Sequence, residues 1–352
     1  MKKKISVILA AVLATVSLAA CGGSKPAETQ APAAGSEAAG GQQAASGGGS
    51  ADWPKSAITV NVAAKAGGGT DLHTRYITTA WQKTVGQAVA VVNFDNAQVA
   101  METGRTAKAD GYNLLTNHSG CVCQYYTGAS EINPVTDYQV IAAMQYMGDQ
   151  AIIVAPDAPY NNMTEFVEYA KAHPGELSCA IANGNSSHFI WGQIAKSAGI
   201  DLKMVEAANE TEKLTNVAGG FITAGNVTIQ NAIQYEDGGK VKVLGLISRD
   251  GVDNEKLVSE RGDNWKTLQS QGIDAAWGGN VYIWAPKDID PAVAEAINAS
   301  LKPVLDDADY QKGCDAMGAV AEWRSVEDSQ KLLEEEEARI KDIADSLGIN
   351  VR

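Results

Sequence analysis

The chain has little positive charge for its length. Its 352 residues include 28 lysines and arginines against 42 aspartates and glutamates, which gives a formal net charge of -14 at pH 7. No basic patch is evident that could neutralise phosphates, so we expect no nucleic-acid partner. Hydrophobic residues make up 45% of the chain, which is enough for sizeable cores, and the length predicts about two domains.

Motifs for nucleotide or nucleophilic chemistry are also absent from the sequence. It contains neither the Gly-Lys-Ser/Thr of a P-loop nor G-x-G-x-x-G, and no G-x-S-x-G. Its histidines are scattered, and Ser187 and His188 are neighbours in a turn, a pattern more typical of capping than of catalysis. We therefore expect no enzyme activity and no cofactor.

The sequence gives equally little indication of a metal site. Cys121 and Cys123 would share one face of an extended segment, but no second Cys/His pair has a ligand spacing. Besides Cys21, the cysteines are Cys121, Cys123, Cys179 and Cys314. They are expected to be buried or disulfide-bonded, and three complete pairings are possible.

The N-terminus has the pattern of an export signal. Residues 2–4 are lysines, residues 5–14 form an apolar run too short to span a membrane as a mature helix, and small residues lead up to Cys21. Residues 18–21, Leu-Ala-Ala-Cys, resemble the bacterial lipobox. They predict a signal peptide over 1–20, lipidation of Cys21 and an extracytoplasmic, membrane-anchored protein; the alternative is a plain secretory signal with a chance cysteine.

The following stretch, to residue 52, cannot form a core. It consists mostly of Gly, Ala, Ser, Gln and Pro with almost no large apolar residues. Residues 21–52 are therefore predicted to be the lipidated cysteine and a flexible tether.

Two glycine-rich turns have the same arrangement of strand, turn and helix. The first joins the alternating run 58–62 to a helix containing Leu72, Tyr76 and Ala80, with Thr70 or Asp71 as the expected N-cap. The second joins 177–181 to a helix that ends at Gly199. Because a helix N-terminus carries unpaired N–H groups and partial positive charge, both turns suit a carboxylate or phosphate.

The alternation of strands and helices predicts an α/β fold with parallel sheets. We expect lobe 1 to comprise residues 53–155 and 278–352 and lobe 2 to comprise 156–277. Ligands of such folds bind beyond the carboxyl ends of the strands, so the two turns would face one cleft. The last helix carries four glutamates at 334–337, which predict a solvated face.

The chain resembles the substrate-binding proteins of tripartite tricarboxylate transporters, the TctC or Bug family. The resemblance spans residues 53–352 and rests on the order and spacing of several short motifs. These are Trp53-Pro54, the strand at 58–60 with Gly67-Gly68-Gly69-Thr70-Asp71 and Arg75, Gly86-Gln87, Ala109-Asp110-Gly111-Tyr112 with Leu114-Leu115, Pro174-Gly175, the turn at 184–188, the run 238–243 and Ala285-Pro286.

The resemblance implies a two-lobed, type II periplasmic-binding-protein fold. Such a protein captures a small organic anion, usually by main-chain amides and waters, and delivers it to large and small transporter membrane subunits; we expect a monomer. Carried over by position, the ligand-binding residues are Ala66, Gly67, Gly68, Gly69, Thr70 and Asp71 in the first turn and Asn183, Gly184, Asn185, Ser186, Ser187 and His188 in the second, with Ser119 and Asn226 as further wall residues.

Two departures from the family pattern affect this expected site. Residues 63–65 are Ala-Ala-Lys where the family usually has Pro-Phe, so Lys65 could add a cation. The glycine-rich loop usual after the second strand is shortened to residues 93–97. The alternatives to transport are a lipoprotein that senses a carboxylate for a signalling receptor and, further from the pattern, a secreted hydrolase.

Overall fold

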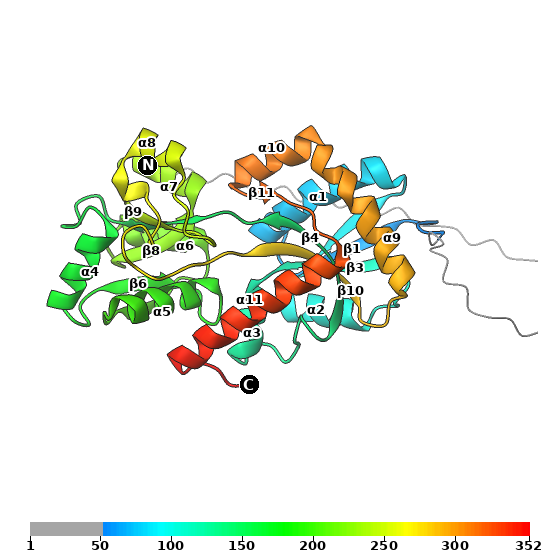
Figure 1. Ribbon diagram of the computed structural model, residues 1–352, viewed down its shortest axis with the longest axis horizontal. Helices are drawn as coiled ribbons and strands as arrows, with labels where there is room; N and C mark the ends of the chain where they lie inside the picture. The colour runs from blue at the N-terminus through cyan, green and yellow to red at the C-terminus, as the bar shows by residue number, and fades with distance from the viewer. Residues whose placement is uncertain (1–51) are drawn as a thin grey trace, which may run out of the picture. The chain divides into compact units, whose positions relative to one another are not determined.

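The structure of the protein, a computed structural model, describes residues 52–352 (Figure 1). The predicted signal peptide, Cys21 and the predicted linker up to residue 51 lie outside the described residues. Within the described part of the chain, no helix has both the length and the apolar character needed to cross a bilayer.

Helices and strands alternate along most of the chain. The strands are β1 (Ile58–Val62), β2 (Val89–Asn93), β3 (Asn113–His118), β4 (Tyr138–Tyr146), β5 (Gln150–Val154), β6 (Ser178–Ile181), β7 (Lys203–Glu206), β8 (Ala224–Thr228), β9 (Lys242–Ile247), β10 (Asn280–Pro286) and β11 (Val320–Ala321). The helices are α1 (Gly69–Val85), α2 (Ala97–Thr106), α3 (Gly120–Tyr126), α4 (Met163–Ala172), α5 (Ser186–Ala198), α6 (Glu210–Ala218), α7 (Ile229–Asp237), α8 (Glu255–Arg261), α9 (Pro291–Leu301), α10 (Ala308–Met317) and α11 (Val326–Leu347), with short 3-10 helices at Asp263–Trp265 and Lys302–Asp306.

The first sheet has six strands in the order β11-β4-β10-β3-β1-β2. β1 pairs in parallel with β2 and β3, as predicted, whereas β10 runs antiparallel to β3 and β4. Ile58 and Val60 of β1 pack in one buried cluster with Ile77 and Trp81 of α1. This packing holds the start of α1 at the carboxyl end of β1.

The second sheet has five strands in the order β7-β6-β8-β5-β9. β6 runs parallel to β7 and β8, and β5 runs antiparallel to β8 and β9. The carboxyl ends of β6, β7 and β8 therefore lie at one edge of this sheet. A helix begins soon after each of them, namely α5, α6 and α7 (Figure 1).

The chain first passes between the sheets at residues 147–149, and not after residue 155 as predicted. β5 pairs with β8 and β9 of the second sheet. In the sequence, β4 and β5 appear as consecutive apolar runs of one lobe. They are separated by Gly148, whose φ of +83° is a conformation that glycine adopts at little cost. The strand after the predicted return at residue 278, β10, pairs in the first sheet.

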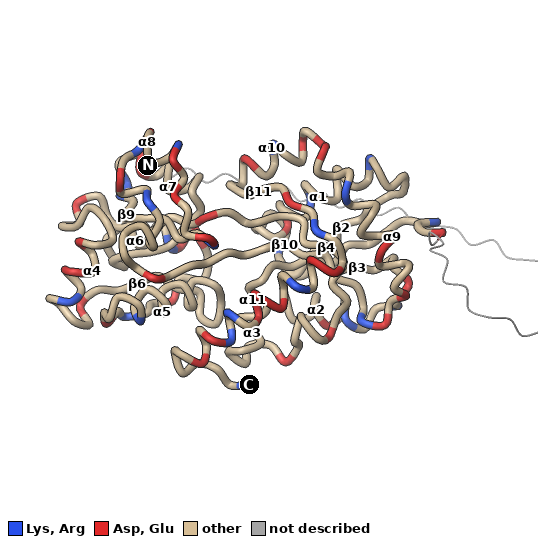
Figure 2. Tube along the Cα trace, in the orientation of Figure 1, with Lys and Arg blue, Asp and Glu red and all other residues tan. Residues whose placement is uncertain are grey.

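Helix α11 contacts β4 and α3 and also α5, so it touches helices that cover both sheets. Its predicted solvated face is wrong at Glu336, which is 2% exposed. The Glu336 carboxylate accepts hydrogen bonds from Asn280 Nδ2 at 2.6 Å and from the Tyr282 hydroxyl at 2.9 Å. Burial raises the pKa of Glu336. Elsewhere, acidic and basic residues are interspersed over the elements of both sheets (Figure 2).

The four described cysteines, Cys121, Cys123, Cys179 and Cys314, are free and buried. Burial raises the pKa of the Cys179 thiol to about 12 and raises that of Cys314, so these thiols remain protonated at neutral pH. Trp191, Trp277 and Trp284 are also buried, and all three belong to the core.

Candidate functional site

The first turn connects β1 to α1 and is fixed by its own backbone. Gly68 N donates to Lys65 O at 3.0 Å, and Gly67 has a φ of +79°. Helix α1 begins at Gly69 with Gly68 as its N-cap, and no side chain caps it. The expected capping by Thr70 or Asp71 is therefore wrong, and the start of α1 keeps amides without a side-chain acceptor.

Asp71, in the first turn of α1, stabilises this glycine-rich turn with its carboxylate. It is 1% exposed and accepts hydrogen bonds from Gly67 N at 2.7 Å, Arg75 Nε at 3.0 Å and Asn93 Nδ2 at 2.8 Å. Burial acts to raise the pKa of Asp71, but these three donors together hold it below its usual value. The Asp71 carboxylate therefore stabilises the turn through these hydrogen bonds.

The second turn connects β6 to α5, and its polar side chains also bond locally. Asn185 is the N-cap of α5 and accepts from Ser186 N at 2.8 Å. The Ser187 hydroxyl accepts from Ala182 N at 2.7 Å, and His188 Nδ1 accepts from Gly184 N at 3.3 Å. Ser187 and His188 therefore bond to separate backbone groups, which does not produce the nucleophile and base of a hydrolase.

Two further helices begin beside these turns. Asn209 caps α6 and accepts from Glu212 N at 3.0 Å. Helix α7 follows Thr228, whose N–H and hydroxyl donate to Glu210 Oε1 at 2.6 and 2.8 Å. A carboxylate at the start of a helix is favourable, so Glu210 fills the anion position of α7.

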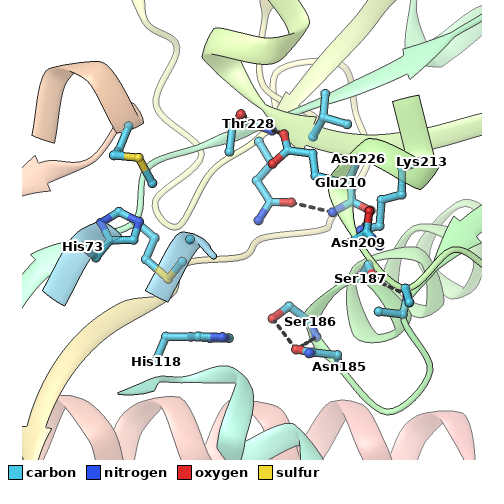
Figure 3. Close-up of a pocket in the computed structure, with 17 residues that line it drawn as sticks. His73, His118, Asn185, Ser186, Ser187, Asn209, Glu210, Lys213, Asn226 and Thr228 are labelled. Atoms are coloured by element: carbon cyan, nitrogen blue, oxygen red, sulfur yellow. Dashed lines mark hydrogen bonds between the residues drawn. The ribbon is translucent and has the colours of Figure 1, made fainter. Parts of the chain in front are cut away.

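These helix starts surround a cavity of about 270 Å³. Figure 3 shows its side chains converging on an open space, with His73 and His118 on one side and Asn209, Lys213 and Asn226 on the other. The lining residues are Gly69, His73, His118, Met147, Gln150, Ala182, Asn185, Ser186, Ser187, Ala208, Asn209, Glu210, Lys213, Asn226, Val227, Thr228 and Met317. The starts of α1, α5, α6 and α7 all contribute.

Five of the predicted ligand-binding residues line this cavity: Gly69, Asn185, Ser186, Ser187 and Asn226. The others do not. Asn183, Gly184 and His188 line a separate cavity of about 430 Å³. Lys65, Ala66 and Gly67 are exposed. Gly68 is the N-cap of α1, and Thr70 and Asp71 are buried in its first turn, outside the cavity lining. Ser119 is 1% exposed, and its hydroxyl accepts from Asn280 N at 2.8 Å.

Lys213 and Glu210 are the charged side chains that the described residues contribute to the lining. Lys213 is 8% exposed, and its ammonium lies 3.4 Å from Asn226 Oδ1. Burial lowers the pKa of Lys213 to about 8, although Glu210 and Glu206 act in the opposite direction. At neutral pH the cavity therefore contains a largely protonated, poorly paired ammonium.

His73 and His118 form a neutral wall of the cavity. Burial lowers the pKa of His73. Burial also lowers the pKa of His118, to about 4, and the neighbouring His73 acts in the same direction. His118 Nδ1 accepts from Gly120 N at 3.0 Å, so its Nε2 carries the proton. His73 is 3% exposed and its Nδ1 has no protein partner. The Nε2–H of His118, which lines the cavity, can therefore donate a hydrogen bond to a ligand.

The sequence analysis missed His73, His118, Gln150, Asn209, Glu210 and Lys213. Helical spacing could have found some of them. His73 is four residues after Gly69 and Lys213 is four after Asn209, so each lies on the same helix face as the residue at the turn. The sequence at 209–212, Asn-Glu-Thr-Glu, is also a helix-start pattern.

A family model described as "Tripartite tricarboxylate transporter family receptor", TctC, matches residues 74–349. The chain belongs to this family. The TctC family consists of periplasmic solute-binding receptors, so the predicted family is confirmed. TctC-type binding proteins are extracytoplasmic.

Solved structures similar to this TctC-family chain share its fold. They include the periplasmic binding protein BugD, with a TM-score of 0.69 and 22% identity over 85% of this chain and 99% of BugD. MatC (Rpa3494) from Rhodopseudomonas palustris with bound malate has a TM-score of 0.69 and 22% identity over 83% and 99% of the two chains. Rpa4515 of R. palustris with adipate has a TM-score of 0.71 and 19% identity over 85% and 99%. The predicted α/β periplasmic-binding-protein fold is confirmed.

Proposed function

We propose that this TctC-family protein captures a small organic carboxylate in the cavity between its two sheets and delivers it to the membrane subunits of a tripartite tricarboxylate transporter. The carrying observation is that helices from both sheets begin at one cavity. Helix N-termini favour anions, and a site that draws on both sheets can close around its ligand. Lipidation of Cys21 would keep the protein at the extracytoplasmic membrane surface.

We assign the two proposed lobes to the two sheets and take residues 147–149 as the first crossing between them. The similar proteins MatC and Rpa4515 contain malate and adipate, both of which are dicarboxylates. Their cargo supports a carboxylate as the ligand class here.

Hydrogen bonds from backbone N–H groups could supply enough free energy to bind a carboxylate with about micromolar affinity. Four charge-assisted N–H bonds contribute about 1.5 kcal/mol each. Two helix N-termini add up to about 1 kcal/mol each. The sum of roughly 8 kcal/mol corresponds to micromolar affinity before ordering costs are subtracted. Lobe closure would strengthen each contact by excluding water.

Gly69→Val is expected to weaken carboxylate binding at least about tenfold while the fold is retained. Gly69 lines the cavity, and a Cβ built there meets no atom within 4 Å, so the valine would extend into open space. Displacing a carboxylate from one helix start removes one or more charge-assisted bonds, each worth roughly a factor of ten. Calorimetric titration with malate and adipate measures the loss.

Ala66→Val is the matched control because it places the same valine side chain in the same turn, at an exposed position outside the cavity lining. It should leave affinity unchanged. Equal affinities for wild type and Gly69→Val would remove the first turn from the site. Absence of binding by the wild-type protein across mono-, di- and tricarboxylates would refute the proposed function.

A further inference from the structure

Lys213 is a buried cation that no carboxylate of the described residues contacts directly. Its side chain lines the cavity from α6, and its one polar contact is the Asn226 oxygen at 3.4 Å, at the limit of a hydrogen bond. No ion pair within residues 52–352 includes Lys213. A buried ammonium without a counterion is unfavourable, which suggests that its counterion comes from the ligand.

The carboxylates nearest to Lys213, those of Glu210 and Glu206, attract its charge and raise its pKa, but their hydrogen bonds go to other groups. Glu210, on the same helix, accepts two hydrogen bonds from Thr228. Glu206, at the end of β7, accepts from Asn183 N at 3.0 Å. Cys179 of β6 is a neutral thiol, and the imidazoles across the cavity, His73 and His118, are neutral. Among residues 52–352, Lys213 is thus the positive charge of the cavity lining, and it has no direct ion-pair partner.

We propose that Lys213 binds a second acidic group of the ligand, so that the cavity selects dicarboxylates over monocarboxylates. This inference rests on the proposed function and assigns its ligand class. One carboxylate would lie at the uncapped start of α1, where Gly69 and His73 line the cavity. The other would lie against Lys213, on the side formed by the second sheet (Figure 3).

Binding measurements in which the charge at residue 213 and the charge of the ligand are varied independently test the proposal. Wild type, Lys213→Gln and Lys213→Arg are titrated with adipate and malate and with the monoamide of each, in which one carboxylate becomes an uncharged amide of similar size. Wild type should bind the dicarboxylate about 30-fold more tightly than the monoamide, since a hydrogen bond to a charged group is worth roughly ten- to a hundredfold.

Lys213→Gln should bind both compounds equally, near the wild-type affinity for the monoamide, and Lys213→Arg should keep the preference. The ratio of the two affinities isolates the charge contact, because a general loosening of the fold would weaken both ligands alike. A preference that persists in Lys213→Gln, or is absent from wild type that binds both compounds, overturns the inference and leaves the proposed function intact. Failure of wild type to bind any carboxylate refutes both.

The same ratio should depend on pH. Because burial lowers the pKa of Lys213 to about 8, the preference of wild type should decline as pH rises above about 8. An arginine at this position stays protonated, so Lys213→Arg should keep its preference up to about pH 10. A parallel decline in both proteins would place the titrating group elsewhere and contradict the role of Lys213.

Discussion

Lys213→Met is expected to stabilise the ligand-free protein by about 3 kcal/mol at pH 7, although it should weaken dicarboxylate binding. Burial shifts the pKa of Lys213 from 10.5 to about 8, and a tenfold change in proton affinity corresponds to about 1.4 kcal/mol. The folded state therefore bears a cost of about 3 kcal/mol for keeping this group charged. Methionine fills similar space without that cost. Chemical denaturation of the two proteins measures the difference.

The stabilisation should disappear at high pH. Below about pH 8, Lys213 is protonated in both folded and unfolded wild type, so the full penalty is present. Between about pH 8 and 10.5 the unfolded chain binds a proton that the folded protein has lost, so the stability of wild type rises towards that of the variant. Above 10.5 the group is neutral in both states and the penalty has vanished.

Lys331→Met is the matched control, since it makes the same substitution on an exposed face of α11. It should change stability by less than about 0.5 kcal/mol at any pH in this range. If Lys213→Met destabilised the protein at pH 7, or if its effect did not vary between pH 7 and 10.5, burial would not impose a net penalty on the charged form of Lys213.

Gly148→Ala is expected to destabilise the protein by about 4 kcal/mol and to lower its melting temperature by about 10 °C. Gly148 lies where the chain first passes between the sheets, with a φ of +83° that costs an alanine about 1 to 2 kcal/mol. A Cβ there would lie 1.9 Å from Gly318 O, a backbone atom at the end of α10. Relieving that overlap requires backbone movement and adds about 1 to 3 kcal/mol.

Gly272→Ala separates these two contributions. Gly272 has a nearly identical φ of +81°, but a Cβ there meets nothing within 4 Å. Its loss of stability should therefore be about 1 to 2 kcal/mol. Equal losses for the two alanine variants in thermal unfolding would show that the contact between Gly148 and Gly318 is not tight.

The sequence predicted the strand-turn-helix units because their signals are local. The strand at β1, the glycines at 67–69 and the apolar period of α1 all lie within about 30 residues. Helix α2 was not among the predicted elements, although Asn96 caps it by accepting from Gln98 N at 2.9 Å. The pairing of strands within a sheet joins residues that are far apart in the sequence. For this reason the sequence placed β5 in the first lobe, whereas it pairs with β8 and β9 of the second sheet.

The sequence predicted that the site binds an anion at helix N-termini, but it did not identify most of the residues that line the cavity. Two helix-leading turns indicated an anion site, and residues of both line the cavity. The geometry adds two more helix starts, those of α6 and α7, which follow β7 and β8 at the same sheet edge. The cation was expected at Lys65, which is exposed, whereas the cavity contains Lys213. Only the folded structure shows which lysine is buried.

A crystal structure of the protein grown with adipate would test the central claim most directly. We expect one carboxylate within about 3 Å of the amides that start α1 and the other within about 3 Å of Lys213 Nζ, the usual distance of charge-assisted hydrogen bonds. An adipate bound outside the cavity lined by Gly69, Ser187 and Lys213, or a cavity that holds only water when adipate is saturating, would contradict the account.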